Sequence, residues 1–270
     1  MLRSESLSLN MLITHSVDFP ESTLPNSALS GVQLTTEKDF SDFTIYEARV
    51  QANSTVPFRS PDNKRSLHFY YCISGRGKFQ ASAGGEKRDI CPDTVIALSS
   101  DVIYELTVSA EGPMRVFVVY YPDNELVYTS LAVVRSLAEI DGTERDVDWG
   151  NGHSWQYLLK PDGLPLGISK TRLNPVTSSK LAHQHHTESV YYTSGRVTYK
   201  WQDTSGTWVN HSSKVDAGNG TNVLLNDHDR HILENHEEYS NCISIFYPAL
   251  TGKEEQVLTE DGFTGFESSY

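Results

Sequence analysis

The fold is decided by one stretch of sequence, Leu181-Ala-His-Gln-His-His-Thr-Glu-Ser-Val-Tyr-Tyr-Thr-Ser-Gly195. It places His183, His185, His186 and Glu188 within six residues, directly before a β-rich run that ends in glycine. Neutral imidazoles and a carboxylate at this density are the ligands that a borderline divalent metal such as iron or zinc needs. The stretch therefore predicts a metal held inside a β-barrel.

Part of this stretch occurs twice in the chain. Tyr70-Tyr-Cys-Ile-Ser-Gly75 recurs as Tyr191-Tyr-Thr-Ser-Gly195, and Val116-Phe-Val-Val-Tyr-Tyr-Pro122 recurs as Ile243-Ser-Ile-Phe-Tyr-Pro248. The members of each pair lie 120 to 126 residues apart. Such offsets indicate one domain-length unit that is used twice.

Both units have the composition of β-structure. Short runs rich in Val, Ile, Tyr, Phe and Thr alternate with clusters of Gly, Asn, Asp and Ser. The pattern predicts an all-β protein of two tandem jelly-roll barrels, the cupin architecture, over residues 1–128 and 129–270. Apolar residues within Ser130–Ile140 lie at helical spacing, so we expect a short helix to link the barrels.

Composition and charge exclude several classes of function. The chain has 270 residues and a formal net charge of −13, which argues against nucleic acid or an anionic membrane as the main partner. Neither a membrane span nor a signal peptide is expected from the apolar pattern. The sparse, odd set of cysteines, Cys72, Cys91 and Cys242, predicts free thiols in a reducing compartment, so we expect a cytoplasmic protein.

The candidate metal ligands of the second unit come from two segments. Side chains two apart on a strand share a face, so His183 and His185 can both point into the barrel. Glu188 can enter from the same or the adjacent strand, and His231 from a neighbouring one. His185 and His228 are the reserve ligands.

From roughly Val133 to Gly265, the C-terminal half resembles ectoine synthase, a small single-cupin enzyme. Five segments match the family in order along the domain: Val134-Arg-Ser-Leu-Ala-Glu-Ile-Asp-Gly-Thr-Glu-Arg-Asp-Val147, Leu158-Leu-Lys-Pro-Asp-Gly163, His185-His-Thr-Glu-Ser-Val-Tyr191, Leu225-Asn-Asp-His-Asp-Arg-His231 and Ile245-Phe-Tyr-Pro-Ala-Leu-Thr-Gly252. An ordered series of matches along a whole domain is far more specific than one short motif.

The resemblance implies a glutamate, a tyrosine and a histidine around an iron-type metal. The glutamate falls on Glu188 and the histidine on His231, but the tyrosine falls on Val223, which cannot bind a metal. His183 stands where the family has another tyrosine that lines the site, and we expect it to supply the lost ligand. His183, Glu188 and His231 would then form a two-histidine, one-carboxylate set for a divalent metal, with iron(II) favoured and zinc compatible.

The resemblance also implies a substrate pocket. The family's substrate-contacting threonine falls on Thr171, its phenylalanine on Phe246 and a nearby cysteine on Ser244. The family's arginine, which would hold a substrate carboxylate, has no counterpart, and Trp155 and Gln156 occupy that region. We expect Trp155 to shape the substrate pocket. Since neither side chain can replace a bidentate arginine clamp, we expect the product of the enzyme to be a molecule other than ectoine.

The N-terminal half follows the same template without the chemistry. Asn63, Arg65 and Ser66 replace the three histidines, His68 stands in place of the glutamate, and Tyr104 in place of the last histidine. One histidine and one tyrosine make a poor metal site. We therefore expect a degenerate cupin that binds no metal.

The leading functional prediction is a carbon–oxygen lyase. Ectoine synthase closes a cyclic amidine from N-acetylated diaminobutyrate with loss of water, and the resemblance implies this or a related ring closure on a small, polar, amino-acid-derived molecule. Two alternatives stay open: a non-haem iron dioxygenase, because the ligand set suits oxygen, and a bicupin that binds a small ligand without catalysis. Since the family pairs as dimers, we expect a pseudo-dimer within one chain and leave a homodimer open.

Overall fold

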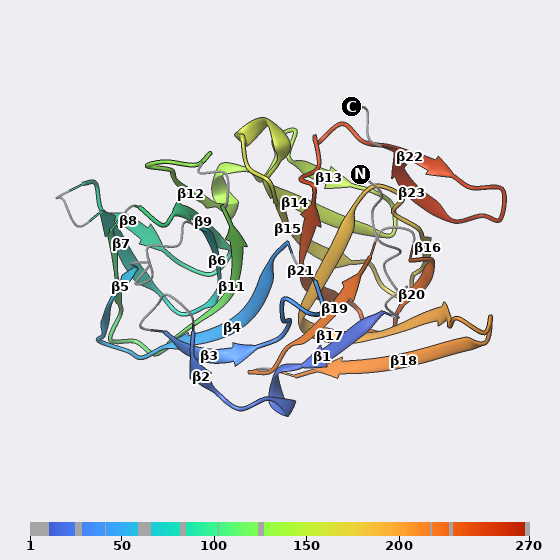
Figure 1. The fold of residues 1–270 in the computed structure, drawn as a ribbon, viewed down its shortest axis with the longest axis horizontal. Helices are drawn as coiled ribbons and strands as arrows, with labels where there is room; N and C mark the ends of the chain where they lie inside the picture. Colours follow the sequence, from blue (N-terminus) through green and yellow to red (C-terminus); the bar gives the residue numbers. More distant parts are fainter. Residues whose placement is uncertain are drawn as a thin grey trace. The chain divides into compact units, whose positions relative to one another are not determined.

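The computed structural model describes residues 11–24, 29–40, 42–58, 66–81, 85–101, 103–123, 127–216, 218–226 and 229–267. These residues form β-strands and three short 3-10 turns, η1 (Ser16–Asp18), η2 (Leu137–Glu139) and η3 (Lys160–Asp162) (Figure 1). They divide into two compact units, which we call the first barrel (residues 16–139) and the second barrel (residues 11–15 and 140–267). The prediction of an all-β chain built from two units is confirmed.

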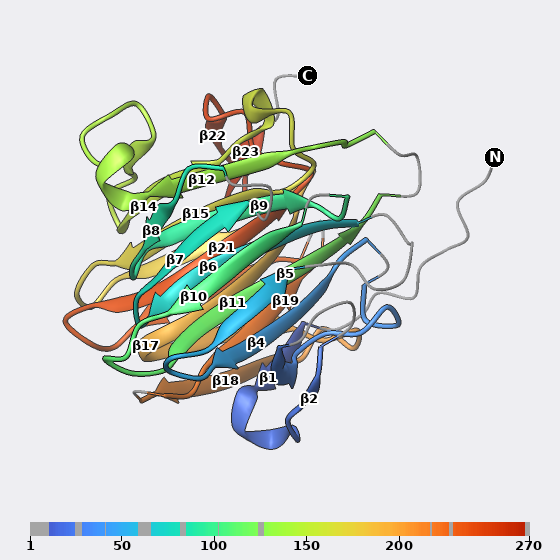
Figure 2. The same cartoon turned by 90° about the vertical axis from the view of Figure 1, so that its left-hand side faces the viewer.

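The first barrel consists of two sheets. The larger has seven strands in the order β12-β9-β6-β11-β4-β3-β2 and the smaller has four in the order β5-β10-β7-β8, whose ribbons can be followed in Figure 2. Their bounds are β2 (Ser22–Thr23), β3 (Ser30–Gln33), β4 (Thr44–Val50), β5 (Thr55–Phe58), β6 (Ser66–Ser74), β7 (Gly77–Ala81), β8 (Arg88–Ile90), β9 (Thr94–Ser99), β10 (Tyr104–Val108), β11 (Met114–Pro122) and β12 (Ala132–Ser136).

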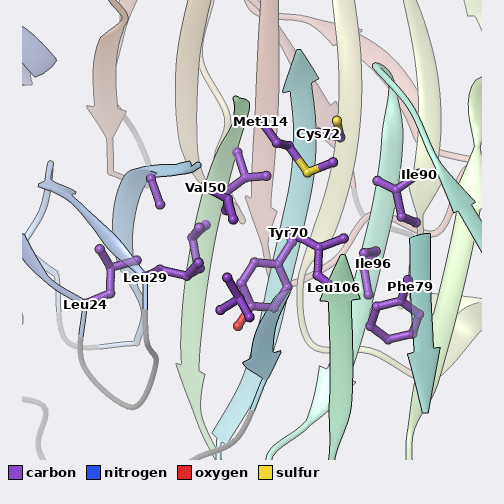
Figure 3. Packing of buried hydrophobic residues seen from close by; sticks show 14 of the residues in the cluster. Leu24, Leu29, Val50, Tyr70, Cys72, Phe79, Ile90, Ile96, Leu106 and Met114 are labelled. Atoms are coloured by element: carbon purple, nitrogen blue, oxygen red, sulfur yellow. The ribbon is translucent and has the colours of Figure 1, made fainter. Parts of the chain in front are cut away.

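Hydrophobic side chains fill the space between these two sheets. On β10, Tyr104, Leu106 and Val108 are buried while the two residues between them are exposed, as expected for a strand with one face in the core. They join one cluster with side chains of the opposite sheet, among them Tyr70 and Ile96 (Figure 3). The interior of the first barrel is therefore a packed apolar core.

The second barrel is built around one long strand, β17 (Thr187–Gln202). The remaining strands are β1 (Leu12–His15), β13 (Asp146–Asp148), β14 (Gly152–Leu158), β15 (Gly167–Leu173), β16 (Ser178–Leu181), β18 (Trp208–Val215), β19 (Thr221–Leu225), β20 (His231–Asn235), β21 (Ser240–Tyr247), β22 (Glu255–Leu258) and β23 (Thr264–Glu267). All twelve are connected by hydrogen bonds in the order β13-β14-β15-β21-β17-β20-β16-β23-β22, with β18 and β19 also on β17 and β1 on β19.

The long strand β17 changes partners midway. Its first half pairs with β19 and β21, its second half pairs with β18 and β20, and a register shift lies between Tyr192 and Ser194. Gly195 follows the shift with a φ of 105°, and a Cβ there would lie 2.0 Å from Ser240 Oγ. Gly75, its counterpart in the first barrel, also has a positive φ, 89°. Only glycine meets both demands, which explains why the repeated motif ends in this residue.

Each barrel has a short edge strand, and β1 of the second barrel precedes the whole first barrel in the sequence. In the second barrel β1 pairs with β19, with Ile13 opposite Val223. In the first barrel β12 pairs with β9, with Val134 opposite Ile96. A 3-10 turn follows directly after each edge strand, η1 after β1 and η2 after β12. The two edge strands are therefore a further pair of structural repeats.

The prediction of a linking helix over Ser130–Ile140 is wrong. The segment forms β12 and η2, because Ala132–Ser136 pair with β9. A run this short has no strong intrinsic preference for helix, so tertiary pairing decides its structure. The division between the barrels also lies between residues 139 and 140, about one short strand beyond the boundary expected from the sequence.

No helix in the described part of the chain has the length and apolar character needed to cross a membrane.

Candidate active site

The second barrel contains a cavity of about 500 Å³, within the range of small-molecule sites. The inward faces of β14, β15, β17, β20 and β21 line it, together with the segment before β17 and the segment after β21. All three expected metal ligands, His183, Glu188 and His231, are among its lining residues. The structure thus gathers side chains that are up to 48 residues apart in the sequence.

Glu188 lies near the start of β17, between Leu225 of β19 and Phe246 of β21. It is only 7% exposed, and a buried carboxylate is costly unless it is paired. His183 Nε2 lies 3.3 Å from Glu188 Oε2. Glu188 and His183 therefore form one polar pair in the wall of the cavity.

His231 is the first residue of β20 and is 1% exposed. Its Nδ1 donates a hydrogen bond of 3.0 Å to the backbone carbonyl of Asp229, so the lone pair of the neutral ring is on Nε2. Burial lowers the pKa of His231 to about 4, with the Asp229 bond and the charge of Glu188 opposing this shift. A neutral imidazole with its second nitrogen oriented in this way has the form that metal-ligating histidines take.

The chemistry of these donors fits a divalent metal, although they do not stand in closed coordination. Within the ranges that the structure describes, no three His, Cys, Asp or Glu side chains are spaced as an assembled metal site. His183 and Glu188 are in contact, and His231 lines the same cavity with its tautomer set by the Asp229 carbonyl. The three-residue ligand set stays a prediction.

The neighbouring histidines differ from the expectation. His185 is exposed and does not line the cavity, whereas His186 is 3% exposed and its Nδ1 donates to the Pro248 carbonyl at 2.9 Å. The reason is local: residues 182–186 are not part of a strand, so the alternation of a strand does not apply to them. The reserve role of His185 is not supported, and His228 lies outside the described residues.

Three expected pocket residues lie in the cavity wall. Thr171 and Ser244 are buried on β15 and β21, and the Thr171 hydroxyl is hydrogen-bonded to Ser154 at 3.0 Å. Phe246 stands edge-on to the His183 ring, with the ring centroids 5.5 Å apart. These side chains give the cavity hydroxyl groups on one side and an aromatic wall beside the polar pair.

Trp155 lies outside the cavity. On β14 it is Ser154 and Gln156 that line the cavity, so Trp155 between them points to the opposite face. There its indole donates to Asp141 at 2.9 Å and stacks with the ring of His153. The expected role of Trp155 in shaping the pocket is therefore corrected.

Three aromatic residues that were not among the expected site residues also line the cavity. Trp149 donates to Ser154 at 3.1 Å, and the hydroxyls of Tyr192 and Tyr199 are hydrogen-bonded to each other at 2.8 Å. Burial is the main cause that holds the pKa of both tyrosines well above its usual value. Tyr192 was predictable, since it follows Glu188 by four residues on one strand and therefore shares its face.

The equivalent place in the first barrel is filled. His68 on β6 lies between Leu98 and Tyr120, just as Glu188 lies between a leucine and an aromatic residue, which supports the proposed equivalence. Its ring nitrogens are hydrogen-bonded to Ser66 at 2.7 Å and to Tyr70 at 3.2 Å. Burial lowers its pKa to about 4. His68 is thus a neutral, satisfied core residue.

Comparison with known proteins identifies relatives of the second half. Residues 132–265 match the family model of ectoine synthase. L-ectoine synthase of Desulfosudis oleivorans is 34% identical over 122 residues, which are 45% of this chain and 89% of that protein. L-ectoine synthase of Oceanobacillus iheyensis is 31% identical over 133 residues, 48% of this chain and 94% of that protein. Each relative is thus matched almost whole by less than half of this chain.

Solved structures resemble the chain as a whole. Oxalate decarboxylase of Lactobacillus farciminis, in a formate complex, has a TM-score of 0.66 at 8% identity and covers 91% of this chain and 89% of its own. Oxalate decarboxylase of Bacillus subtilis, in a study of its Mn(II) centres, has a TM-score of 0.64 at 10% identity, over 91% of this chain and 78% of its own. At such identities the likeness concerns the fold alone, and it confirms two tandem cupin barrels.

Proposed function

Because this chain belongs to the ectoine synthase family, we propose that its second barrel is a metal-dependent lyase. The reaction is a ring closure with loss of water on a small polar molecule. One observation carries this proposal: the half of the chain that matches the family contains a cavity into which Glu188, His183 and His231 all project. Catalysis requires a site that holds reactants together away from bulk water, and this cavity provides it.

A divalent metal, with iron(II) favoured, would be held by His183, Glu188 and His231. When bound, such a metal polarises an amide or carbonyl oxygen and makes its carbon more electrophilic. The hydrogen bond from His231 Nδ1 to Asp229 supports this assignment, because it leaves the lone pair of the neutral ring on Nε2, where a metal could bind. The identity of the metal belongs to the proposal.

The other cavity residues have positioning roles in the proposed reaction. The hydroxyls of Thr171, Ser154 and Ser244 and the amide of Gln156 offer hydrogen bonds that orient a polar substrate. Phe246 stands edge-on to the His183 ring and adds apolar surface beside the polar pair. Holding an amine and an amide of one molecule close together removes most of the entropic cost of closing the ring.

The test is a direct assay of ring closure. Full-length protein, purified after expression with iron or zinc, is analysed for metal and incubated with N-acetylated diaminobutyrate and with analogues that keep its amine and amide. Stoichiometric metal and release of a cyclic amidine from an analogue support the proposal. Efficient formation of ectoine from N-acetylated diaminobutyrate would contradict the expectation that the product is a different molecule. Oxygen consumption would favour the dioxygenase, and absence of metal with insensitivity to chelators would favour a binding protein.

We also propose that the tandem chain forms internally the pair that single-barrel relatives form as dimers. The supporting observation is β1, which precedes the first barrel in the sequence but pairs with β19 of the second. The solution mass of the whole chain tests this proposal: a monomer is expected. A truncated chain that begins near Ser130 would be a poor test, since it also lacks β1 and leaves the edge of β19 unpaired.

A further inference from the structure

The charges that line the cavity are all of one sign. Among the described lining residues, Asp148, Glu188 and Glu254 carry carboxylates, and none is a lysine or an arginine. Asp148 lies at the exposed end of β13, Glu188 is buried in the wall, and Glu254 is half-buried in the segment after β21. A bound divalent metal would set two positive charges against the three carboxylates, which leaves one negative charge in excess. The cavity is therefore an acidic environment with or without its metal.

The two cations of β15 point away from the cavity. Ser169 and Thr171 of β15 line the cavity, so Lys170 and Arg172 lie on the other face of the strand. There the Lys170 ammonium and the Arg172 guanidinium each lie 5.5 Å from the centre of the Trp155 ring. These cation–π contacts hold both charges on the outer surface, where they cannot pair with a ligand in the cavity.

Two arginines of the second barrel are bound to carboxylates elsewhere. Arg145 donates two hydrogen bonds to Asp162, of 2.9 Å and 2.8 Å. Arg230 is paired with Asp261 and lies over the ring of Phe263, 5.6 Å from its centre. Neither arginine lines the cavity. Among the residues that the structure describes, no guanidinium lines the cavity where it could clamp a substrate carboxylate.

Glu254 is held in position by its own loop. Its carboxylate accepts hydrogen bonds from the backbone N–H groups of Thr251 and Gly252, the latter at 2.9 Å. A carboxylate has about four acceptor positions, so these two bonds leave others for a ligand. An ammonium group placed there would lose part of its hydration and form an ion pair with Glu254 in a half-buried site. A ligand carboxylate would be repelled by the same negative charge.

Resting on the proposed ring closure, we infer that the substrate is a small mono-acylated diamine, a cation that carries no carboxylate. In the balanced reaction the amine nitrogen bonds to the amide carbon, the carbon–oxygen bond breaks, and the oxygen leaves as water with two protons from nitrogen. An ammonium substrate becomes an amidinium product, so one positive charge is present before and after the step. The acidic cavity therefore stabilises both the ammonium substrate and the amidinium product.

The test compares two ligands that differ only in a carboxylate. Binding of N-acetyl-1,3-diaminopropane and of N-acetylated diaminobutyrate to the metal-loaded, full-length protein is measured by calorimetry, with neutral N-propylacetamide as a third ligand. We expect the carboxylate-free cation to bind at least about tenfold more tightly than either of the others. The inference is overturned if N-acetylated diaminobutyrate binds as tightly as N-acetyl-1,3-diaminopropane or more tightly, or if N-acetyl-1,3-diaminopropane does not bind.

Charge variants sharpen the comparison. Glu254→Gln keeps a hydrogen-bond acceptor but removes the charge, so we expect the preference for the cation over N-propylacetamide to fall by about fivefold or more. Glu255→Gln is the matched control, because this neighbouring carboxylate is exposed and does not line the cavity, and it should leave the preference unchanged. Equal effects of the two variants would show that general surface charge, not the cavity, attracts the cation, and would overturn the inference.

Failure of the inference is distinguishable from failure of the proposed function. If the cation binds tightly but no cyclic amidine and no water are released, the ligand class stands and the lyase proposal fails. If N-acetylated diaminobutyrate is closed to ectoine with higher efficiency than the carboxylate-free diamine is closed, the lyase proposal stands and the ligand class fails.

Discussion

The two barrels share a fold and differ in what lies inside them. In the first, the side chains between the sheets form an apolar cluster, and His68 is hydrogen-bonded to its neighbours Ser66 and Tyr70. In the second, Glu188 occupies the equivalent place in the wall of a cavity of about 500 Å³. The comparison teaches that the jelly roll tolerates either a packed core or a polar cavity, and that a few inward-facing residues decide between them.

The largest expected effect separates Glu188 from its counterpart. Glu188→Gln removes the only carboxylate of the proposed ligand set, so we expect metal affinity to fall by more than about 100-fold, since even residues behind metal ligands cost 10- to 100-fold. Ring closure should be lost with the metal. Metal content after dialysis, measured by mass spectrometry, checks this, and His68→Gln at the equivalent place should retain full metal. Equal metal loss in both variants would contradict the division of roles.

Acid should destabilise the first barrel through His68. Its pKa is about 4 in the folded barrel against 6.5 for the free side chain, so the unfolded chain binds the extra proton first. Stability is therefore lost as the pH falls from about 6.5 to about 4, by about 3 kcal/mol for this group. Hydrogen exchange of β6 in a urea series at pH 7 and pH 4 measures the loss, which His68→Gln should largely remove. An unchanged pH dependence in that variant would rule out this cause.

The edge strands offer a matched pair of smaller effects. Ile13 of β1 and Val134 of β12 are partly buried, each against the core of its own barrel. Truncation of either to alanine should cost about 1–2 kcal/mol, less than for a fully buried site. All four tryptophans lie in the second barrel, so Ile13→Ala should shift the fluorescence unfolding curve and Val134→Ala should leave it in place. A shift in both would mean that the barrels unfold together.

The smallest effect is expected at His185. Because its side chain is exposed and outside the cavity, His185→Ala should change stability by less than about 0.5 kcal/mol. Metal affinity should stay within about twofold, since the histidine is not among the expected ligands. Metal titration of the variant beside wild type checks this, and a loss comparable to that of Glu188→Gln would restore His185 as a ligand.

Much of the fold was predictable from repetition in the sequence. The repeated Tyr-Tyr and glycine motif predicted two like units, and the structure shows why the glycine recurs: Gly75 and Gly195 both have positive φ beside a close neighbouring strand. Glu188 and His231 could also be placed in one cavity, because each stands at a recognisable position in a domain-length pattern. The sequence reveals these features because few other residue types could occupy the same positions.

Other features depend on pairings that local sequence does not encode. The four residues of β1 have no partner nearby in the chain, so their place beside β19 could not be anticipated. Trp155 was expected in the pocket because of its position, but only the alternation of β14 decides that Ser154 and Gln156 face inward. His185 was expected inward because residues 182–186 were read as a strand, which they are not.

The edge strand β1 also constrains the order of events on the ribosome. His15 of β1 is hydrogen-bonded to Thr221, 206 residues further along, so β1 emerges long before its partner strand exists. At about 5–20 residues per second, translation of that interval takes roughly 10 to 40 seconds. During this time the first barrel has all of its strands available as soon as β12 has left the exit tunnel, while β1 waits as an unpaired segment. Completion of the second barrel is thus tied to a strand that is translated before the whole first barrel.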